Sequence, residues 1–469
     1  MSSGERIYDA LVVGGGPAGA TAALVMARAG LAVRVCERTR FPRFHIGESF
    51  LPANLELIRE LGLEAELRRL PQVEKRGVEF TFGHGREWQL FPFNGGLLGD
   101  ANATFNIERA PFDAMLLEAA VGAGAEVSQE TAVRRVLRLD EEGVQVETDR
   151  GETIAARVLL DASGQATLIA KHLGLRRPLP DHDKVAYFQH FEGVERRPGT
   201  EAGYPTMVMC DEGWFWIIPI DERRDSIGLV MDAGAARRIG VAPGQMLAWG
   251  IARCPLLRRR TARASRPAGN LVNADFSYRC EPFAGPGYFL VGDAATFIDP
   301  IFSTGVCLGM MSAVEAGRGA VAMLRQGARA ARVRRRYNRF VASSSAPFFR
   351  MVRGYYHHSF RELFIQGSGP LQVHKAALSV LAGSVFPRPV WALRWRLWLL
   401  FALMHANRHW PVAPRREHFS LLGPEADATA ARADLATAAD GTNAALSAAT
   451  AAAMPEVARA AAQAVPTAL

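Results

Sequence analysis

A glycine-rich turn near the amino terminus constrains the fold of this chain more than any other feature. The apolar stretch 8–13 predicts a strand, residues 20–29 predict a helix, and residues 31–36 predict a second strand that ends at Glu37. The turn between the first strand and the helix reads Gly14-Gly15-Gly16-Pro17-Ala18-Gly19. This order of strand, glycine turn, helix, strand and acid is typical of Rossmann-type α/β folds that bind the ADP half of a dinucleotide.

The residue types in this turn each have a physical reason. Gly14 permits the tight turn, Gly16 lets backbone N–H groups approach a pyrophosphate, and Gly19 allows the helix to pack closely on the strand. Ala18 belongs to the same turn, where the helix begins. Glu37 is positioned to accept hydrogen bonds from ribose hydroxyls. These five residues are therefore the predicted nucleotide contacts.

Length and charge limit the possible classes of protein. A chain of 469 residues is too long for one ordinary domain, so two or three lobes are expected. The formal charge of +8 arises from 55 basic and 47 acidic residues without a basic block, which argues against nucleic-acid binding and favours small anionic or acidic partners. The most membrane-like stretch, 376–404, contains Pro387, Arg388, Pro389, Arg394 and Arg396, so no transmembrane span is expected.

The five cysteines are odd in number, widely scattered and without CxxC spacing. This pattern predicts neither a disulfide framework nor a zinc site, and no metal is expected. It is typical of a reducing compartment, and no charged-then-apolar signal segment precedes the first strand. A cytoplasmic localisation is therefore expected.

The segment Trp214-Phe215-Trp216-Ile217-Ile218-Pro219 carries the second strong signal. Its pattern predicts a buried strand that ends where proline cannot donate to the ladder. Trp214 and Trp216 are two residues apart, so they point to one face of such a strand. The pair forms either ordinary core packing or an indole wall that bounds a reaction site, and the two interpretations are compatible.

With these segments in order, the chain resembles the flavin-dependent halogenases of the glutathione-reductase-like flavoprotein monooxygenases over residues 5–410. Residues 214–219 match the family signature WxWxIP, and residues 41–52 are similar to the family segment that follows the second strand. The resemblance implies a Rossmann-type FAD-binding fold with an inserted, mostly β substrate lobe and a helical carboxyl-terminal region. It places Asp293 at the ribityl chain of FAD and Arg109 near the flavin diphosphate, although Asp293 also fits a helix cap.

Lys75 occupies the position where the family keeps an essential lysine, just before a strand that begins near Gly77. An isolated lysine is usually a solvated surface charge. This chain, however, has only four lysines, Lys75, Lys171, Lys184 and Lys375, among its 55 basic residues. A primary amine can be chlorinated or can donate a hydrogen bond to HOCl, whereas the delocalised guanidinium of arginine is a poor substitute. A catalytic role is therefore expected for Lys75.

The segment 298–306 supplies the predicted halide site. Ser303, Thr304 and Gly305 are small residues whose N–H groups can hold an anion, and they can equally cap a helix. By resemblance they lie beside the isoalloxazine and contact chloride or bromide. Tryptophan halogenases have a glutamate just before this motif, where this chain has Phe302. Phe302 resembles the phenol and pyrrole branch, so free tryptophan is not the expected substrate. Together with the tryptophan pair, Phe302 is expected to separate substrate from flavin.

The resemblance implies an FADH2- and O2-dependent halogenase of natural-product biosynthesis. Halide would be oxidised to HOCl near the flavin, and HOCl would reach an electron-rich phenolic or pyrrolic ring through Lys75. The ring is free or tethered to an acyl or peptidyl carrier protein. Because no second nucleotide fingerprint is visible, a separate flavin reductase is expected to supply FADH2. The alternative is an aromatic hydroxylase or alkene reductase of the same fold, which chloride dependence would distinguish.

The expected organisation of the chain is discontinuous. The FAD-binding lobe would comprise 1–80, 104–175 and 275–345, and the substrate lobe would comprise 81–103 and 176–274. Residues 346–411 are expected to be helical, with Trp391, Trp395 and Trp398 forming either an apolar face for an acyl partner or core packing. The Ala-rich tail 412–469 predicts a weak helix or a disordered segment.

Overall fold

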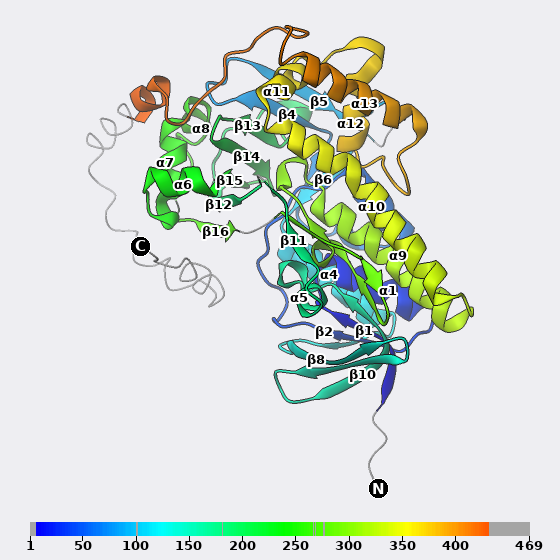
Figure 1. Cartoon of the computed structure of the whole chain (residues 1–469). Helices are drawn as coiled ribbons and strands as arrows, with labels where there is room; N and C mark the ends of the chain where they lie inside the picture. Colours follow the sequence, from blue (N-terminus) through cyan, green and yellow to red (C-terminus); the bar gives the residue numbers. More distant parts are fainter. Residues whose placement is uncertain are drawn as a thin grey trace, which may run out of the picture.

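The computed structural model describes residues 6–99, 102–180, 182–265, 267, 269–274 and 277–430. One lobe is built on a mostly parallel sheet and the other on a mostly antiparallel sheet (Figure 1). Two long helices run from the first lobe towards the second, where shorter carboxyl-terminal helices complete the fold (Figure 1).

The first large sheet carries the nucleotide turn. Its strands are β1 (Ile7–Val13), β2 (Val33–Cys36), β7 (Glu126–Ser128), β8 (Val133–Asp140), β9 (Gly143–Thr148), β10 (Thr153–Asp161), β18 (Ala284–Gly285) and β19 (Tyr288–Leu290). Their order is β18-β19-β10-β1-β2-β7, with β9 on β10 and β8 on β9. Parallel pairing of β2, β1, β10 and β19 brings their carboxyl ends to one edge of the sheet, where such folds bind ligands.

Helices pack closely around this sheet. They are α1 (Pro17–Arg28), α2 (Pro52–Glu60), α3 (Glu64–Arg68), α4 (Arg109–Gly122), α5 (Leu168–His172) and α9 (Gly305–Arg325). A Cβ added to Gly317 of α9 would lie 3.1 Å from Val25 of α1, so small residues allow these two helices to approach. The start of α9 is thereby held beside the nucleotide turn.

The second large sheet forms the substrate-type lobe. Its strands are β4 (Gly77–Phe82), β5 (Trp88–Pro92), β12 (Lys184–Glu192), β13 (Thr206–Met209), β14 (Gly213–Pro219), β15 (Arg224–Asp232) and β16 (Leu271–Ala274). The order is β16-β12-β15-β14-β13-β4-β5, and only β13 and β4 pair in parallel.

Three helices lie against this sheet: α6 (Ala233–Ile239), α7 (Met246–Arg253) and α8 (Pro255–Arg260). Gly250 of α7 lies directly on Phe215 and Leu229, because a Cβ added there would be 2.9 and 2.8 Å from their side chains. Since side chains alternate along a strand, Trp214 and Trp216 point to the opposite face of β14. The sheet therefore presents its indole pair away from these helices.

Two small sheets lie at points where the chain passes between the lobes. One pairs β3 (Gln72–Lys75) with β6 (Thr104–Ile107), and the other joins β11 (Arg176–Pro178), β17 (Tyr278–Cys280) and β20 (Thr296–Phe297). Strand β4 spans residue 80 and pairs wholly within the second large sheet. Helix α10 (Ala330–Tyr355) continues across residue 345. The expected division into lobes stays a prediction, and these two elements cross its boundaries.

The carboxyl-terminal region adds α11 (His358–Ile365), α12 (Val373–Leu381) and α13 (Trp391–Ala406). The chain then packs on the second lobe, where Phe419 is buried against Gly83 and Arg253 pairs with Asp427. Within the tail expected from residue 412 to be weakly helical or disordered, residues 424–430 are helical, and the chain contacts the second lobe as far as Thr429. Residues 431–469 lie outside the described residues.

Among the described residues, α9 is the one helix that is long and apolar enough to cross a membrane. Half of its apolar window, 50%, is buried within the protein. Its packing against α1 and α10 accounts for that composition, because a central helix of a large lobe is apolar on most sides. The stretch 376–404 is divided between α12 and α13, with a break around Pro387.

Candidate active site

The nucleotide turn has the close backbone contacts that its glycines allow. Gly14 has a φ of +103°, and a Cβ at this position would overlap the carbonyl oxygen of Ala162. A Cβ at Gly19 would overlap the carbonyl oxygen of Gly14. Ala18 lies 3.1 Å from the position of a Cβ added at Gly292, which joins the turn to the end of β19. The structure thus brings the first strand, its helix and the later Gly-Asp segment together.

Glu37 directly follows β2 and is buried beside the turn. One of its carboxylate oxygens accepts from the backbone N–H of Gly15 at 2.7 Å, and the other accepts from the N–H and hydroxyl of Thr39. Arg43, which the sequence did not single out, lies 3.3 Å from the position of a Cβ added at Gly16. A guanidinium over a glycine turn is well placed to contact a pyrophosphate.

Arg109 begins α4 and is engaged by protein groups. Its Nε and Nη2 donate to the two oxygens of Asp113 at 2.7 and 3.0 Å, and its Nη1 donates to the carbonyl of Ile46 at 2.9 Å. Arg43 also donates to Asp113, at 3.2 Å. Arg109 therefore holds the segment that carries Ile46, and its contact with a flavin stays a prediction.

Asp293 follows β19 and stands close to the predicted halide turn. Its Oδ1 is 3.9 Å from the position of a Cβ added at Gly305. Removal from water raises the pKa of Asp293 to about 6, and the charge of Arg109 opposes this rise. Among the described residues, no donor hydrogen-bonds to this carboxylate, so it is available to a ligand hydroxyl. Together with the open face at Gly16, this free carboxylate fits an FAD that extends from the turn towards α9.

The predicted halide turn has a distinctive backbone. Ser303 has a φ of +55°, in the left-handed region, and its N–H donates to the carbonyl of Pro300 at 2.9 Å. Thr304 is buried and caps α9, which begins at the exposed Gly305. The first N–H groups of a helix have no partner within the helix and carry partial positive charge. The turn can therefore hold an anion next to Asp293, and the halide role of these residues stays a prediction.

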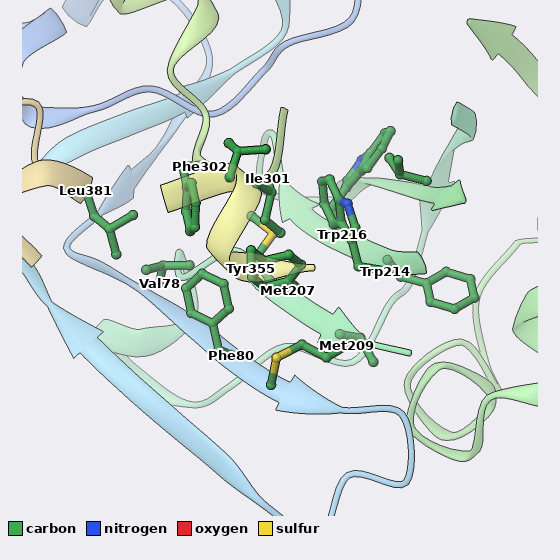
Figure 2. Packing of buried hydrophobic residues seen from close by; sticks show 14 of the residues in the cluster. Val78, Phe80, Met207, Met209, Trp214, Trp216, Ile301, Phe302, Tyr355 and Leu381 are labelled. Carbon is green, nitrogen blue, oxygen red and sulfur yellow. The ribbon is translucent and has the colours of Figure 1, made fainter. Parts of the chain in front are cut away.

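Phe302 lies in an aromatic cluster rather than at an open edge. Its ring centroid is 6.3 Å from that of Phe80, 5.9 Å from Tyr355 and 6.4 Å from Phe364. Figure 2 shows Phe302 beside Ile301, with Phe80 and Tyr355 packed near it. A glutamate at this position would place a charge among buried rings, at a cost of several kcal/mol unless it were neutralised.

The tryptophan pair is buried within the same apolar core as Phe302 (Figure 2). The ring centroids of Trp214 and Trp216 are 5.8 Å apart, and Nε1 of Trp216 donates to Ser226 at 3.1 Å. Gly228 stands opposite Trp216 in β15, where a Cβ would overlap the indole. The glycine thus leaves space for the indole of Trp216. This packing is compatible with both interpretations of the pair, an indole wall and ordinary core packing.

Tyr356 connects this wall to the segment before the halide turn. Nε1 of Trp214 donates to the Tyr356 hydroxyl at 3.1 Å, and that hydroxyl donates to the buried carboxylate of Asp299. Burial raises the pKa of Asp299 to about 6. Nζ of Lys184 lies 4.2 Å from the centre of the Tyr356 ring. Sequence patterns gave no signal for Tyr356 or Asp299, because the pair joins segments 57 residues apart.

Lys75 ends β3 and is buried, with 3% of its surface exposed. Its Nζ donates to the carbonyl of Phe50 at 2.9 Å and lies 5.3 Å from the centre of the Phe93 ring. Among the described residues, no carboxylate forms a hydrogen bond or an ion pair with Lys75. Burial lowers the pKa of Lys75 from 10.5 to about 7. About half of the amine is therefore neutral, and so able to act as a nucleophile, near pH 7.

Comparison with known proteins identifies the family. A family profile described as an FAD binding domain matches residues 7–230. The 1H-pyrrole-2-carbonyl-(peptidyl-carrier protein) brominase of Pseudoalteromonas luteoviolacea is 33% identical over 318 residues, which cover 66% of this chain and 76% of that protein. The chain belongs to the flavin-dependent halogenases.

Another relative and a solved structure are also halogenases by name. The tryptophan 2-halogenase of Chondromyces crocatus is 33% identical over 316 residues, which cover 65% of this chain and 59% of that protein. The structure of the flavin-dependent brominase Bmp2 matches with a TM-score of 0.76 and 29% identity, covering 86% of this chain and all of that chain. The predicted fold class, FAD and halide as cofactors, and the enzyme class are confirmed.

A buried acid–base pair in the halogenase was missed by the sequence analysis. Glu48 is buried, and one of its oxygens lies 2.5 Å from Nε2 of His190 on β12. This contact raises the pKa of His190 against the effect of its burial. The second oxygen of Glu48 is buried without a hydrogen-bond partner among the described residues. The conspicuous Gly-Glu-Ser within residues 41–52 was the available signal for this pair.

The halogenase also brings together Asp211, His358 and His418, whose ligand atoms lie within 4.8 Å of one another. Nε2 of His358 is 2.9 Å from Asp211, and the two imidazole rings stack with centroids 3.8 Å apart and an angle of 15°. A single ion cannot lie in both of two stacked ring planes, so metal binding would require one ring to rotate. With the two rings stacked, the cluster connects the segment around His418 to Asp211 of the second lobe through His358.

Proposed function

We propose that this halogenase chlorinates or brominates an electron-rich pyrrolic or phenolic ring that a carrier protein presents as a thioester. The observation that carries the proposal is the position of the Lys75 amine, which is buried, donates to the carbonyl of Phe50 and lies 5.3 Å from the centre of the Phe93 ring. Burial also lowers the pKa of this amine. Phe302 supports the substrate class, because a ring activated by its own oxygen or nitrogen needs no carboxylate opposite it. The name of the P. luteoviolacea relative supports carrier-bound pyrrole.

Bound FAD, once reduced by a separate flavin reductase, would supply the oxidation of halide to hypohalous acid with O2 as the oxidant, because O2 takes two electrons from the reduced flavin and two from the halide and leaves hypohalous acid and water. The residues of the chain bind, separate and orient. The N–H groups at the start of α9 hold the halide beside Asp293, and Trp214 and Trp216 keep the organic substrate away from the flavin. The amine of Lys75 receives the hypohalous acid and directs it to one carbon of the ring. We place this chemistry in the cytoplasm, with which five free, buried cysteines are compatible.

The proposal is tested by reconstitution with FAD, NADH, a flavin reductase and chloride or bromide. Pyrrole-2-carboxylate and a hydroxybenzoate are supplied as free acids, as small thioesters and on a carrier protein, and products are read from isotope patterns by mass spectrometry. Halogenation of the carrier-bound forms is expected. Efficient halogenation of the free acids alone would remove the carrier from the proposal.

Free tryptophan is the competing substrate, because one relative of similar identity is named a tryptophan 2-halogenase. It is expected to remain unmodified, since Phe302 provides no base or hydrogen-bond acceptor for an indole N–H. Lys75→Ala and Lys75→Arg are expected to bind FAD and consume O2 but to release hypohalous acid without product. Wild-type halogenation by either variant would overturn the role of Lys75, and efficient turnover of tryptophan would overturn the substrate class.

A further inference from the structure

Helix α13 presents a row of tryptophans to solvent. Trp391 and Trp398 are 75% and 66% exposed, and Trp395 lies between them at helical spacing, with its ring centroid 6.1 Å from that of Trp391. Arg394 is exposed on the same face. We call Trp391, Arg394, Trp395 and Trp398 the α13 stripe. The opposite face of the helix carries the buried Leu393, Leu397 and Leu400, so the stripe is not needed for packing.

The segment that carries the α13 stripe is rich in basic residues. From residue 366 to residue 416 the chain contains no aspartate or glutamate and seven basic residues: Lys375, Arg388, Arg394, Arg396, Arg408, Arg415 and Arg416. Arg415 and Arg416 pair with Glu362 and Glu87, which lie outside this stretch, so the attraction is assigned to the other five. A region with this composition attracts an acidic surface, and exposed aromatic residues next to arginine are typical of the centre of a binding interface.

A cavity of about 160 Å³ lies behind α13, between this helix, α12 and residues 412–414. Its lining includes Leu400 and Leu403 of α13 on one side and Phe91 and Phe364 on the other. The Phe91 and Phe364 rings stack with centroids 4.6 Å apart, and Phe364 reaches Phe80 at 4.8 Å. The cavity therefore runs from α13 towards the aromatic cluster that contains Phe302.

The cavity lining is connected through the sequence to the residue beside Lys75. Phe91 and Phe93 are two residues apart, and Phe93 is the ring next to the Lys75 amine. Helix α12 closes this side, because the N–H of Leu97 donates to the hydroxyl of Ser379 at 2.8 Å. Strand β5, which contributes Phe91 to the cavity, is therefore followed directly by the residue that contacts the amine.

We propose that the α13 stripe is the docking surface for the acidic recognition surface of a carrier protein, and that the cavity behind α13 admits the tethered ring. This inference rests on the proposed function and adds its partner site. A substrate carried on a protein needs a docking surface and an entry next to each other, which is the arrangement found here. An anionic membrane would also attract tryptophan and arginine, but it would not require a cavity that leads inward.

The test compares Trp391→Ser, Trp398→Ser and Arg394→Glu with wild type on two substrates. These are pyrrole-2-carboxylate bound to a peptidyl carrier protein and the same acid as a small thioester. The variants are expected to raise KM for the carrier-bound substrate by about tenfold or more and to change turnover of the small thioester by less than about twofold. Added salt is expected to raise KM for the carrier-bound substrate in wild type.

Arg335→Glu is the matched control, because Arg335 is exposed on α10, outside the basic stretch. It makes the same change of charge and is expected to leave both activities unchanged. An equal effect of Arg335→Glu and Arg394→Glu would show general electrostatic attraction and would overturn docking at α13. Equal loss on both substrates in the α13 variants would also overturn it, since that result reports damage to the site itself.

Failure of this inference is distinguishable from failure of the proposed function. If wild type halogenates the carrier-bound ring and the α13 variants do so equally well, the docking surface is wrong and the function stands. If wild type modifies only free or small substrates, the carrier protein is excluded as a partner in both the proposed function and the docking inference. Sedimentation with phosphatidylglycerol vesicles that is lost in Trp391→Ser, without any effect on carrier turnover, would assign the stripe to a membrane instead.

Discussion

The buried amine of Lys75 should cost the protein stability, and its removal should show this. Lys75→Met keeps an unbranched side chain of similar length and removes the ionisable group. Because burial lowers the pKa of Lys75 from 10.5 to about 7, the folded protein binds this proton more weakly than the unfolded chain does. At pH 7 the lysine therefore lowers the free energy of unfolding by about 4 kcal/mol.

One interaction opposes the stability that is gained when Lys75 is replaced by methionine. The amine donates to the carbonyl of Phe50 at 2.9 Å, and methionine leaves that buried oxygen without its donor. The loss is about 1–3 kcal/mol, so Lys75→Met is expected to be more stable than wild type by about 1–3 kcal/mol at pH 7. The hydrogen bond does not depend on pH over this range, because a neutral amine still donates.

The dependence on pH separates the two contributions. Above the unfolded pKa of 10.5 the amine is neutral in both states and costs nothing, and the cost grows as pH falls until it is constant below about 7. The advantage of Lys75→Met should therefore be about 3 kcal/mol smaller at pH 10 than at pH 7. Other groups titrate alike in both proteins and cancel in the difference.

The assay is urea unfolding at the two pH values with saturating FAD, followed by tryptophan fluorescence. Lys171→Met is the control, because Lys171 is exposed on α5, and it should differ from wild type by less than about 0.5 kcal/mol. A difference in unfolding free energy between Lys75→Met and wild type that is the same at both pH values would refute a buried amine with a lowered pKa. It would then also weaken the assignment of this amine as a nucleophile.

Three further changes probe other parts of the site. Gly19→Ala should abolish FAD binding, measured by flavin fluorescence titration, because the new Cβ would overlap a backbone carbonyl of the turn. Tyr356→Phe should lower the free energy of unfolding by about 2–3 kcal/mol, measured in urea, because it orphans the Trp214 N–H and a buried carboxylate. Glu48→Gln should lower the pKa of His190, measured by NMR. In wild type the raised pKa of folded His190 adds stability that is fully present below the ordinary imidazole pKa of 6.5 and is lost as pH rises through the folded pKa. Glu48→Gln should remove this contribution. An unchanged FAD affinity, stability or imidazole titration would contradict the respective argument.

The nucleotide turn could be predicted from sequence because its determinants are local. Gly14, Gly19 and Glu37 lie within 24 residues of one another, and each has a backbone or side-chain geometry that few other residues allow. The same holds for the tryptophan pair, because alternation along one strand is enough to place both rings on one face. In both cases the local sequence is enough to predict how these residues are arranged relative to one another.

Other parts of the site could not be predicted, because they depend on pairs that are distant in sequence. Arg43 reaches the turn through the fold of residues 41–52, and His190 meets Glu48 across 142 residues. No periodicity links such positions. The contacts of residues 412–430 were also not predicted, since the Ala-rich composition indicated only a weak helix or a disordered segment, and Phe419 and Leu421 are buried against the second lobe.

The contacts of Tyr356 explain why the carboxyl-terminal region and the reaction site cannot vary independently. Its hydroxyl joins the indole of Trp214 to the carboxylate of Asp299, which begins the turn that continues through Phe302 to the predicted halide site. The neighbouring Tyr355 packs on Phe302 itself. A movement of the end of α10 is therefore expected to displace, through two adjacent tyrosines, both the tryptophan pair and the turn that leads to α9. If Trp214, Trp216 and Phe302 separate the substrate from the flavin as predicted, a helix movement that admits a larger ring would also displace these residues, and this would limit substrate choice.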